Sequence, residues 1–341
     1  MAVLSKFEWR RLTFAAIFVV LLTLALREIA PSPQAAADFS GSERGREVVI
    51  EIPEGATGSE VGSLLFENGV IASSLSFFRV AVADERSSRI APGEHRLDTK
   101  ISAREALDQL LDPNRILNLI RIRDGSRLSE VLSSLKEIGF TNGEIKSALR
   151  EIDVAPPFNK NKLEGLLYPA FYSKSQTDTA KAMLQKMVDR FEASTADLSW
   201  KYGKFTPYEL LTIASLVESE GIPVDFLKVS QVIYNRLRLG MPLQFDSTVH
   251  YIFDRRGEIQ LSIKDTQVKN PYNTFQNRGL PPGPIGSPTR AAIEATLNPA
   301  SGPWLYFVTV LPKQTKFTED YDQFLQFKAE YKRNFAAGEF E

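Results

Sequence analysis

The 341-residue sequence contains no cysteine and only two histidines, His95 and His250. The absence of cysteine excludes disulfides, zinc–thiolate sites and thiol nucleophiles. Two histidines are too few for a histidine metal cluster, and a Ser-His-Asp triad would have to use one of them. The sequence around His95 predicts a turn that enters a strand, and we interpret His250 as a core or rim residue. We therefore expect no cofactor and no metal site.

The sequence also lacks an excess of charge of either sign. It has 41 Lys and Arg against 42 Asp and Glu, and no basic block stands out. Because phosphate contacts need clustered cations, this balance argues against nucleic acid as the partner.

One long apolar run is present near the N-terminus, from Leu12 to Leu26, with basic residues before it. A run of this length is short for a bilayer span, but flanking aromatic residues extend it into the interface. We predict a cytoplasmic tail (1–11), a single transmembrane anchor (12–29) and a Pro/Ala-rich tether (30–46). The bulk of the chain is then expected outside the cytoplasm, for example in the periplasm. A cleaved signal peptide is the competing interpretation.

An internal repeat follows the tether at an offset of seventy residues. Ile50–Gly55 aligns with Ile120–Gly125, and the match continues through Ser59–Val61 and Ser129–Val131. Each copy reads as a short strand, a glycine turn and a serine-capped helix.

The composition changes after Glu151, at a Pro-rich boundary, and helical patterns dominate from about residue 160. We predict an α+β chain with a small N-terminal α+β region (47–155) and a larger, mainly helical domain with short strands (160–330). A short tail (331–341) ends the chain.

A carboxylate is predicted at the end of a helix in the second region. Thr206–Glu209 reads as a capping box with proline at the first helical position, and Gly221 ends the helix. Glu218 then lies in the last turn, at the border of the buried stripe, where the helix dipole and burial both disfavour its charged form. A raised pKa suits a general acid. Glu220 points to a different side, roughly 200° around the helix. The alternative for Glu218 is an ordinary solvated glutamate at a frayed helix end.

Rigid loops rich in proline and glycine follow this helix, with amide, hydroxyl and aromatic side chains between them. Such surfaces suit sugars, whose hydroxyls need fixed partners and whose faces stack on rings. The segments in question are Ala214–Glu220, Tyr234–Leu237, Gly240–Val249, Pro271–Thr274 and Gly279–Ile285.

Taken in order, these segments resemble the membrane-anchored endolytic murein transglycosylases, the YceG-like or MltG-type family. Leu163–Pro169 is similar to the motif that opens the family's catalytic domain, and the resemblance covers about residues 46–325. It implies a LysM-like module in the N-terminal region. It also implies that peptidoglycan glycan strands are the substrate and that MurNAc-β-1,4-GlcNAc bonds are cleaved to leave 1,6-anhydroMurNAc ends. The cutting would set glycan strand length, and the resemblance implies cell-wall synthases as partners.

The resemblance places the catalytic glutamate at Glu218, in agreement with the helix argument. We interpret six further residues as substrate-binding or supporting: Gln244, Asn235, Asp246, Tyr272, Asn273 and Glu220. Two positions depart from the family pattern: Ala170 replaces an aspartate, and Lys316 lies where the family has a histidine-containing segment.

Two alternatives to a transglycosylase stay open. The first is a non-catalytic peptidoglycan-binding scaffold. The second is a hydrolytic muramidase that uses Glu218 together with Asp246 as a second carboxylate.

Overall fold

The computed structural model describes residues 36–40, 44–53, 55–175, 177–256 and 261–340. The chain divides into two compact units. Unit 1 holds the described residues up to Ile90 together with His95–Arg115, and unit 2 holds Ala91–Glu94 and the chain from Ile116 onward. The predicted catalytic region and the second copy of the repeat therefore belong to the same unit.

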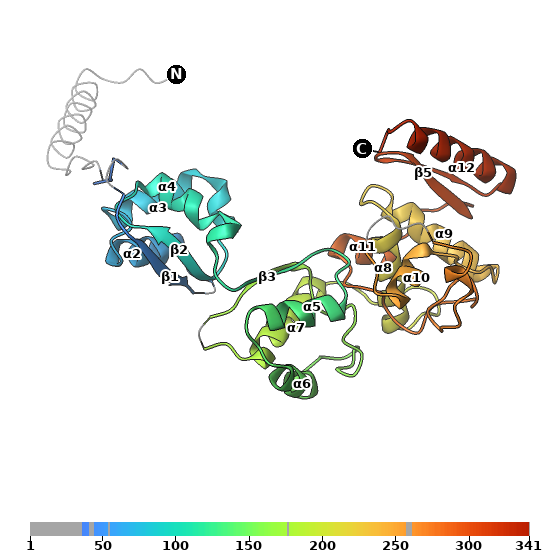
Figure 1. Ribbon diagram of the computed structural model, residues 1–341, viewed down its shortest axis with the longest axis horizontal. Coiled ribbons are helices and arrows are strands. Elements are labelled where there is room, and N and C mark those ends of the chain that lie inside the picture. Colours follow the sequence, from blue (N-terminus) through green and yellow to red (C-terminus); the bar gives the residue numbers. More distant parts are fainter. Residues whose placement is uncertain (1–35, 41–43, 54, 176, 257–260, 341) are drawn as a thin grey trace, which may run out of the picture. The chain divides into compact units, whose positions relative to one another are not determined.

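Unit 1 is a two-stranded sheet with three α-helices (Figure 1). Strand β1 (Glu47–Ile52) pairs with β2 (Gly93–Asp98), and the helices are α2 (Gly58–Glu67), α3 (Ser74–Ala83) and α4 (Ala103–Leu110). Two short 3-10 helices cover Glu85–Arg89 and Pro113–Arg115. Apolar residues of the strands and helices form one core, in which Leu65, Phe77 and Leu107 are fully buried.

The first part of unit 2 contains the second copy of the repeat. Strand β3 (Leu119–Ile122) leads into α5 (Leu128–Glu137) and α6 (Asn142–Glu151). Strand β4 (Ala170–Ser173) pairs with β3 in antiparallel fashion, with Ile120 opposite Tyr172. Helix α7 (Ala180–Thr195) packs against α6 and closes this core.

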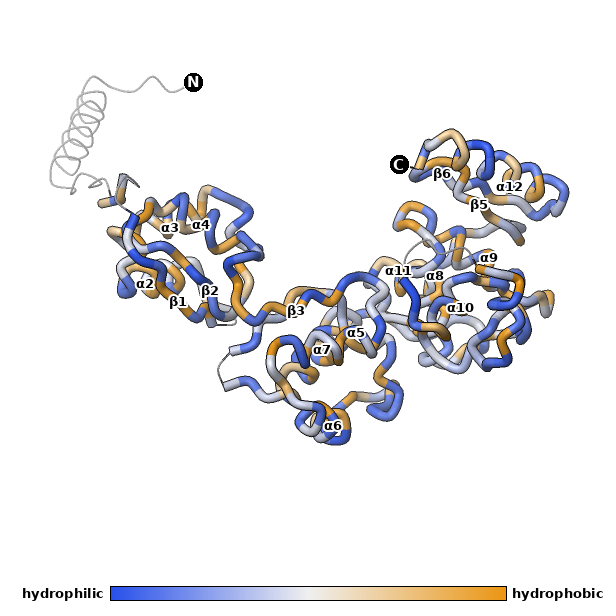
Figure 2. Tube along the Cα trace, in the orientation of Figure 1, coloured by the Kyte–Doolittle hydropathy of each residue, from blue (hydrophilic) through white to orange (hydrophobic). Residues whose placement is uncertain are grey.

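The second part of unit 2 is built around α8 (Pro207–Glu220), which packs against α9 (Phe226–Arg238) and α11 (Arg290–Leu297). The short helix α10 (Asp246–Ile252) and the 3-10 helix Asp265–Gln267 lie in the segment between α9 and α11. A hairpin of β5 (Tyr306–Leu311) and β6 (Gln314–Thr318) then carries the last helix, α12 (Tyr321–Ala336), on β5. Hydrophobic residues (orange in Figure 2) recur along the helices of both units between hydrophilic ones, as amphipathic packing requires.

The mixed, mainly helical α+β class predicted from the sequence is confirmed. The apolar, aromatic run of residues 304–308 predicts a strand, and the structure confirms it with shifted ends, as β5. The predicted serine caps of the repeat are wrong, because Thr57 caps α2 and the residue before α5 is Arg127. Helix α2 begins directly after Thr57 and α5 directly after Arg127, so Ser59 and Ser129 lie inside the first turn of each helix.

The predicted anchor (12–29) lies outside the described residues. Among the helices that the structure describes, none combines the length and the hydrophobicity that crossing a bilayer requires. The parts of the tether that are described, 36–40 and 44–46, have no regular secondary structure.

Candidate active site

Helix α8 positions the candidate catalytic glutamate, and local sequence explains both its ends. The predicted capping box is present: the Thr206 N–H donates to Glu209 Oε2 at 2.7 Å, and the Glu209 N–H donates to Thr206 Oγ1 at 3.3 Å. All residues from Leu210 to Val217 are buried, so the helix runs through the core of unit 2. Glu218 follows this buried stretch in the last turn of α8, and its side chain is partly exposed to solvent.

The Glu218 carboxylate is held by one residue of another helix. Its Oε2 accepts a hydrogen bond from the Thr289 N–H at 2.9 Å and from Thr289 Oγ1 at 2.6 Å. Thr289 is the N-cap of α11, and its hydroxyl also accepts from the Ala292 N–H. Because the threonine is fixed by the helix that it caps, the carboxylate has a defined orientation.

The turn of the second repeat copy closes the other side of Glu218. Gly125 N–H donates to Ser287 O at 2.8 Å, and Ser287 N–H donates to Ser126 O at 2.8 Å, so the two loops pair through their backbones. A Cβ on Gly125 would lie 3.8 Å from Glu218 Cγ, and a Cβ on Gly286 would lie 2.4 Å from Gly125 O. Glycine at 286 is therefore required for the loops to approach this closely.

The surroundings of Glu218 raise the pKa of its carboxyl group. Partial burial is the main cause, and the negative charge of Asp124 on the neighbouring turn adds to it. The two hydrogen bonds from Thr289 act in the opposite direction because they stabilise the charged form. The net raised pKa agrees with the role of a proton donor.

Glu220 lies on a different side of α8, as the sequence predicts, and has its own environment. Its carboxylate accepts a hydrogen bond from Ser247 Oγ. Burial raises the pKa of Glu220 to about 7, with a further contribution from the nearby Asp246. Asp246 at the start of α10 is thus coupled to Glu220, whereas the acidic group that acts on Glu218 is Asp124.

The loops beside α10 carry two more of the predicted site residues. Gln244 is exposed, has a left-handed backbone (φ 52°) and donates its N–H to Thr274 O at 3.1 Å. Tyr272 is half-buried and packs on Tyr251, with 4.9 Å between ring centroids. Both side chains reach the surface of unit 2, and their proposed contacts with substrate stay predictions.

The two predicted asparagines hold loops together. Asn235 is 3% exposed and donates through Nδ2 to the carbonyl oxygens of Gly302 and Trp304, both at 2.9 Å. Asn273 is fully buried and donates through Nδ2 to Thr266 O and Val268 O. Because these amides are saturated within the chain, we interpret both residues as supports for loop geometry.

Several residues at the site are missed by the sequence reasoning. Thr289 and Asp124 carry no motif that links them to Glu218, although Asp124-Gly125 forms the turn of the repeat. Glu164 is also missed: it accepts from the Leu128 N–H at 2.9 Å and from the Tyr251 hydroxyl at 3.0 Å, and so joins the second repeat copy to α10. Burial raises the pKa of Glu164. Among the described residues, no group of three or more His, Asp or Glu side chains is placed to hold a metal ion.

The two departures from the family pattern have structural roles of their own. Ala170 lies in β4 opposite Ile122. Lys316 in β6 forms an ion pair with Glu330 of α12 at 2.8 Å, so it ties the hairpin to the last helix.

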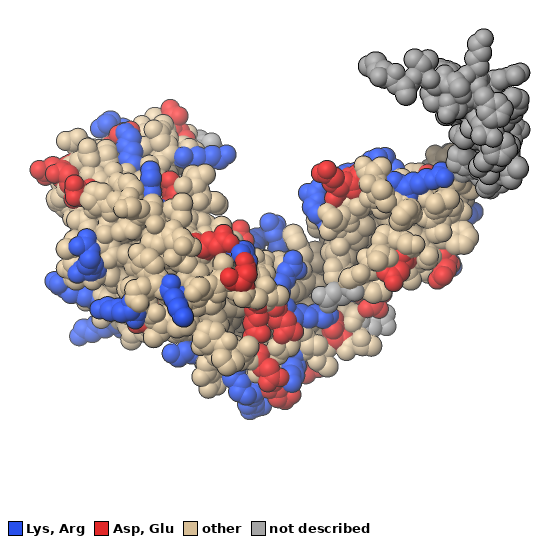
Figure 3. Space-filling view, turned by 180° about the vertical axis from the view of Figure 1, so that it is seen from behind, with Lys and Arg blue, Asp and Glu red and all other residues tan. Residues whose placement is uncertain are grey.

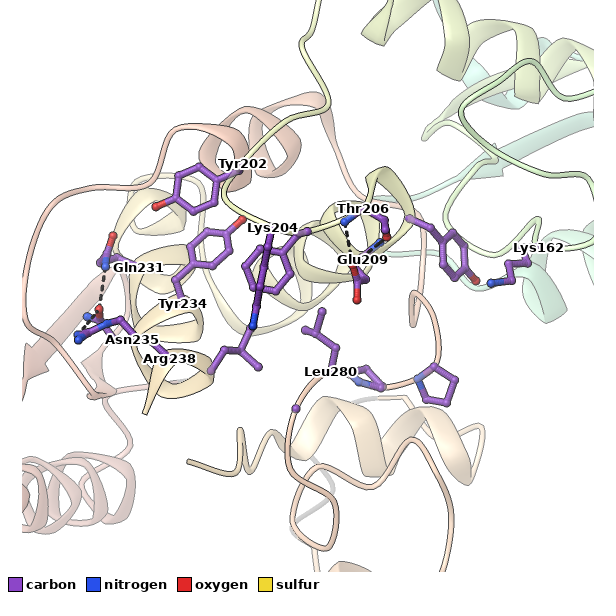
Figure 4. A pocket seen from close by; sticks show the side chains of 16 residues that line it. Lys162, Tyr202, Lys204, Thr206, Glu209, Gln231, Tyr234, Asn235, Arg238 and Leu280 are labelled. Carbon is purple, nitrogen blue, oxygen red and sulfur yellow. Dashed lines mark hydrogen bonds between the residues drawn. The ribbon is translucent and has the colours of Figure 1, made fainter. Parts of the chain in front are cut away.

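A separate cavity of about 920 Å³ lies at the opposite end of α8 (Figure 4). Its lining includes Tyr202, Tyr234, Asn235 and Leu280. Glu209, also in the lining, lies nine residues before Glu218, which is roughly 14 Å along a helix axis. This cavity is therefore distinct from the surroundings of Glu218.

Comparison with known proteins agrees with the resemblance seen in the sequence. The YceG-like family matches residues 50–330. The chain is 30% identical over 309 residues to the endolytic murein transglycosylase of Bacillus subtilis, covering 83% of this chain and 84% of that protein. It is 29% identical to the endolytic murein transglycosylase of Streptococcus pneumoniae strain D39, but spans about half (54%) of that protein's length.

The fold is also similar to that of a solved structure. The crystal structure of a putative YceG-like protein from Listeria monocytogenes superposes with a TM-score of 0.55 at 24% identity, covering 82% of this chain and 98% of that one. Since the family match alone spans most of the sequence, the chain belongs to the YceG-like family.

Proposed function

We propose that this protein is an endolytic murein transglycosylase that cleaves MurNAc-β-1,4-GlcNAc bonds and leaves 1,6-anhydroMurNAc ends. The observation that carries the proposal is the half-buried carboxyl of Glu218, whose pKa is raised and which Thr289 orients. The names of the relatives from Bacillus subtilis and Streptococcus pneumoniae support the same activity.

In the proposed mechanism, protonated Glu218 donates its proton to the leaving glycosidic oxygen. The resulting carboxylate takes the proton of the MurNAc C6 hydroxyl as that oxygen attacks the anomeric carbon. The C–O bond to the leaving sugar breaks, the C1–O6 bond forms, and Glu218 ends protonated. Because the sugar supplies the nucleophile, no second carboxylate is needed to activate water.

A hydrolytic muramidase is the second candidate, because one acidic residue does lie beside Glu218. That residue is Asp124, not the predicted Asp246, which acts on Glu220. A hydrolase would use Asp124 to activate water and would release reducing ends.

The location of the protein and its partners are part of the proposal. The apolar run of residues 12–26, preceded by basic residues, supports an anchor in the cytoplasmic membrane with the enzyme outside the cytoplasm. There it would meet nascent glycan strands, and cell-wall synthases are the expected partners because endolytic cutting must accompany polymerisation. Side chains of both charge signs are distributed over the face shown in Figure 3, which fits a substrate other than nucleic acid.

The test is product analysis on intact sacculi by mass spectrometry. The full-length protein should release anhydro-ended oligomers, and Glu218→Gln should lower the rate by at least about a hundredfold, the usual scale for loss of a general acid. Glu339→Gln, at an exposed glutamate with no role at the site, is the control and should leave the product unchanged. Reducing ends that disappear in Asp124→Asn would support the hydrolase, and sacculi bound but not cut by the wild type would support the scaffold.

A further inference from the structure

The two copies of the repeat carry equivalent surface grooves. The groove of unit 1 measures about 420 Å³ and lies between the end of β1 and α2, over residues Pro53–Glu67. The groove of the second copy measures about 550 Å³ and lies between the end of β3 and α5. Seven of the eight residues that line the first groove have a counterpart seventy positions later that lines the second. The repeat therefore produces the same concave surface twice.

Most of the shared positions are explained by folding. Glu60 accepts from the Thr57 N–H at 2.7 Å, and its counterpart Glu130 accepts from the Arg127 N–H at 2.8 Å, so both begin their helices in the same way. Serine also occurs at two equivalent lining positions in both copies, Ser59/Ser129 and Ser63/Ser133, and glutamate occurs at the helix end as Glu67/Glu137. The acidic residue Asp124 likewise has an acidic counterpart, Glu54. These shared residues therefore serve the fold of the repeated module.

Two arginines distinguish the second groove from the first. Arg121 and Arg123 occupy the positions that are Glu51 and Pro53 in the first copy, and all four are exposed. Since the first copy forms the same strand and helix without them, the fold does not require arginine at either position. The first copy is thus an internal control: residues present in both copies serve the fold of the module, whereas Arg121 and Arg123 are particular to the second copy.

The charges of these two arginines are available to a ligand. Arg256 in the same groove forms an ion pair with Glu130 at 2.6 Å. Across the described residues, neither Arg121 nor Arg123 lies within ion-pair distance of a carboxylate; the Arg121 guanidinium lies 5.4 Å from the Phe171 ring. Both side chains flank the turn whose Gly125 contacts Glu218. A substrate bound at Glu218 and extending along β3 would meet two uncompensated guanidinium groups.

We propose that Arg121 and Arg123 bind carboxylate groups of the peptide stems that glycan strands carry, and so make the enzyme selective for stem-bearing strands. This inference rests on the proposed function. Guanidinium groups bind carboxylates through paired, charge-assisted hydrogen bonds, which suits the ends and side chains of peptides. Arg121 lies in β3 and Arg123 directly follows it, and both are exposed on either side of the buried Ile122. This alternation places the two arginines on the same face, so they can engage one stem or two neighbouring carboxylates.

The test compares two substrates, stem-bearing glycan strands and the same strands after an amidase has removed the peptides. The full-length wild type should have a higher kcat/KM on stem-bearing strands. In Arg121→Gln/Arg123→Gln, the ratio of kcat/KM between the two substrates should fall about tenfold or more, chiefly through KM, as expected for the loss of hydrogen bonds to charged groups. Glu51→Gln, at the position of the first copy that corresponds to Arg121, is the matched control and should keep the wild-type ratio.

Each outcome decides between the proposals. A wild type that forms anhydro ends but has equal kcat/KM on both substrates, or a folded double variant with the wild-type ratio, would overturn the arginine proposal alone. A wild type that forms no product from either substrate would overturn the proposed function and this inference with it. If the double variant unfolds at a lower temperature, Arg121→Glu replaces it, because the first copy shows that glutamate fits this strand position.

Discussion

At the scale of single residues, the chemistry of the site depends on two opposing influences on one carboxyl group. Burial and Asp124 raise the pKa of Glu218, and the Thr289 hydrogen bonds lower it. In the proposed mechanism, burial and Asp124 keep the acid protonated before cleavage. The Thr289 hydrogen bonds stabilise the carboxylate that exists after the proton has left. Both influences serve the proposed mechanism, in which the group donates a proton in one half of the reaction and accepts one in the other.

These influences predict opposite shifts of the pH profile. Thr289→Val removes a hydrogen bond to the carboxylate, so the pKa of Glu218 rises further and the alkaline limb of kcat/KM moves to higher pH. Asp124→Asn removes a repelling charge, so the pKa falls and the same limb moves to lower pH. Thr289→Ser keeps the hydroxyl and should retain the wild-type limb. If the alkaline limb moved in the same direction in Thr289→Val and in Asp124→Asn, this account of the site would be contradicted.

At the scale of elements, α8 shows what local sequence can determine. Its start, its end and the side on which each glutamate lies follow from the capping box, Gly221 and the helical period. The partners of Glu218 do not follow from it. Thr289 is 71 residues away, and its hydrogen bonds exist because the loop before α11 packs against the turn at Gly125. That packing depends on tertiary contacts that no local pattern encodes. The sequence therefore predicts Glu218 itself but not the junction of three segments that surrounds it.

The close approach of these loops can be tested at Gly286. In Gly286→Ala the added Cβ meets Gly125 O, and backbone on both sides must move. We expect a loss of about 1–3 kcal/mol in the free energy of unfolding and a fall in activity, measured by urea denaturation and by release of anhydro ends. Gly143→Ala in α6, whose Cβ would have its nearest contact at 3.8 Å, should change stability by no more than about 0.5 kcal/mol. Equal stability of the two variants would show that the loops are not in tight contact.

At the scale of the whole molecule, the sequence predicts the class of fold and the repeat but not how the second copy is used. Both copies look alike in sequence from Ile50 and from Ile120, and nothing in either pattern tells which one adjoins the catalytic helix. The distinction lies in partners such as Glu164 and Ser287, which contact the second copy from elsewhere in unit 2. The predicted roles of Asn235 and Asn273 depended on the same missing information, since their amides are occupied by loops that the sequence could not place.

The stability of the protein should depend on pH through Glu220. The pKa of Glu220 is raised from 4.5 to about 7, so its neutral form stabilises the fold below about pH 4.5 and this contribution is lost as the pH rises through 7. Glu220→Gln should therefore be more stable than the wild type at pH 8, by on the order of 2 kcal/mol, with a difference near zero at pH 4.5. Urea unfolding at the two pH values measures this, with the exposed Glu339→Gln as control. A constant difference at both pH values would mean that Glu220 ionises in the same way in the folded and unfolded chain.

In the proposed mechanism, the junction at Glu218 also sets when the enzyme can begin to work. Its two flanking residues, Asp124 and Thr289, are 165 positions apart (289 − 124), and the site is complete only when both have folded against α8. A chain still emerging during synthesis has no such junction until residue 289 has been made and has docked. Cutting activity is thus absent from every shorter nascent chain. For an enzyme that cuts peptidoglycan, assembling the site from distant segments delays activity until residue 289 has been synthesised and has folded against α8.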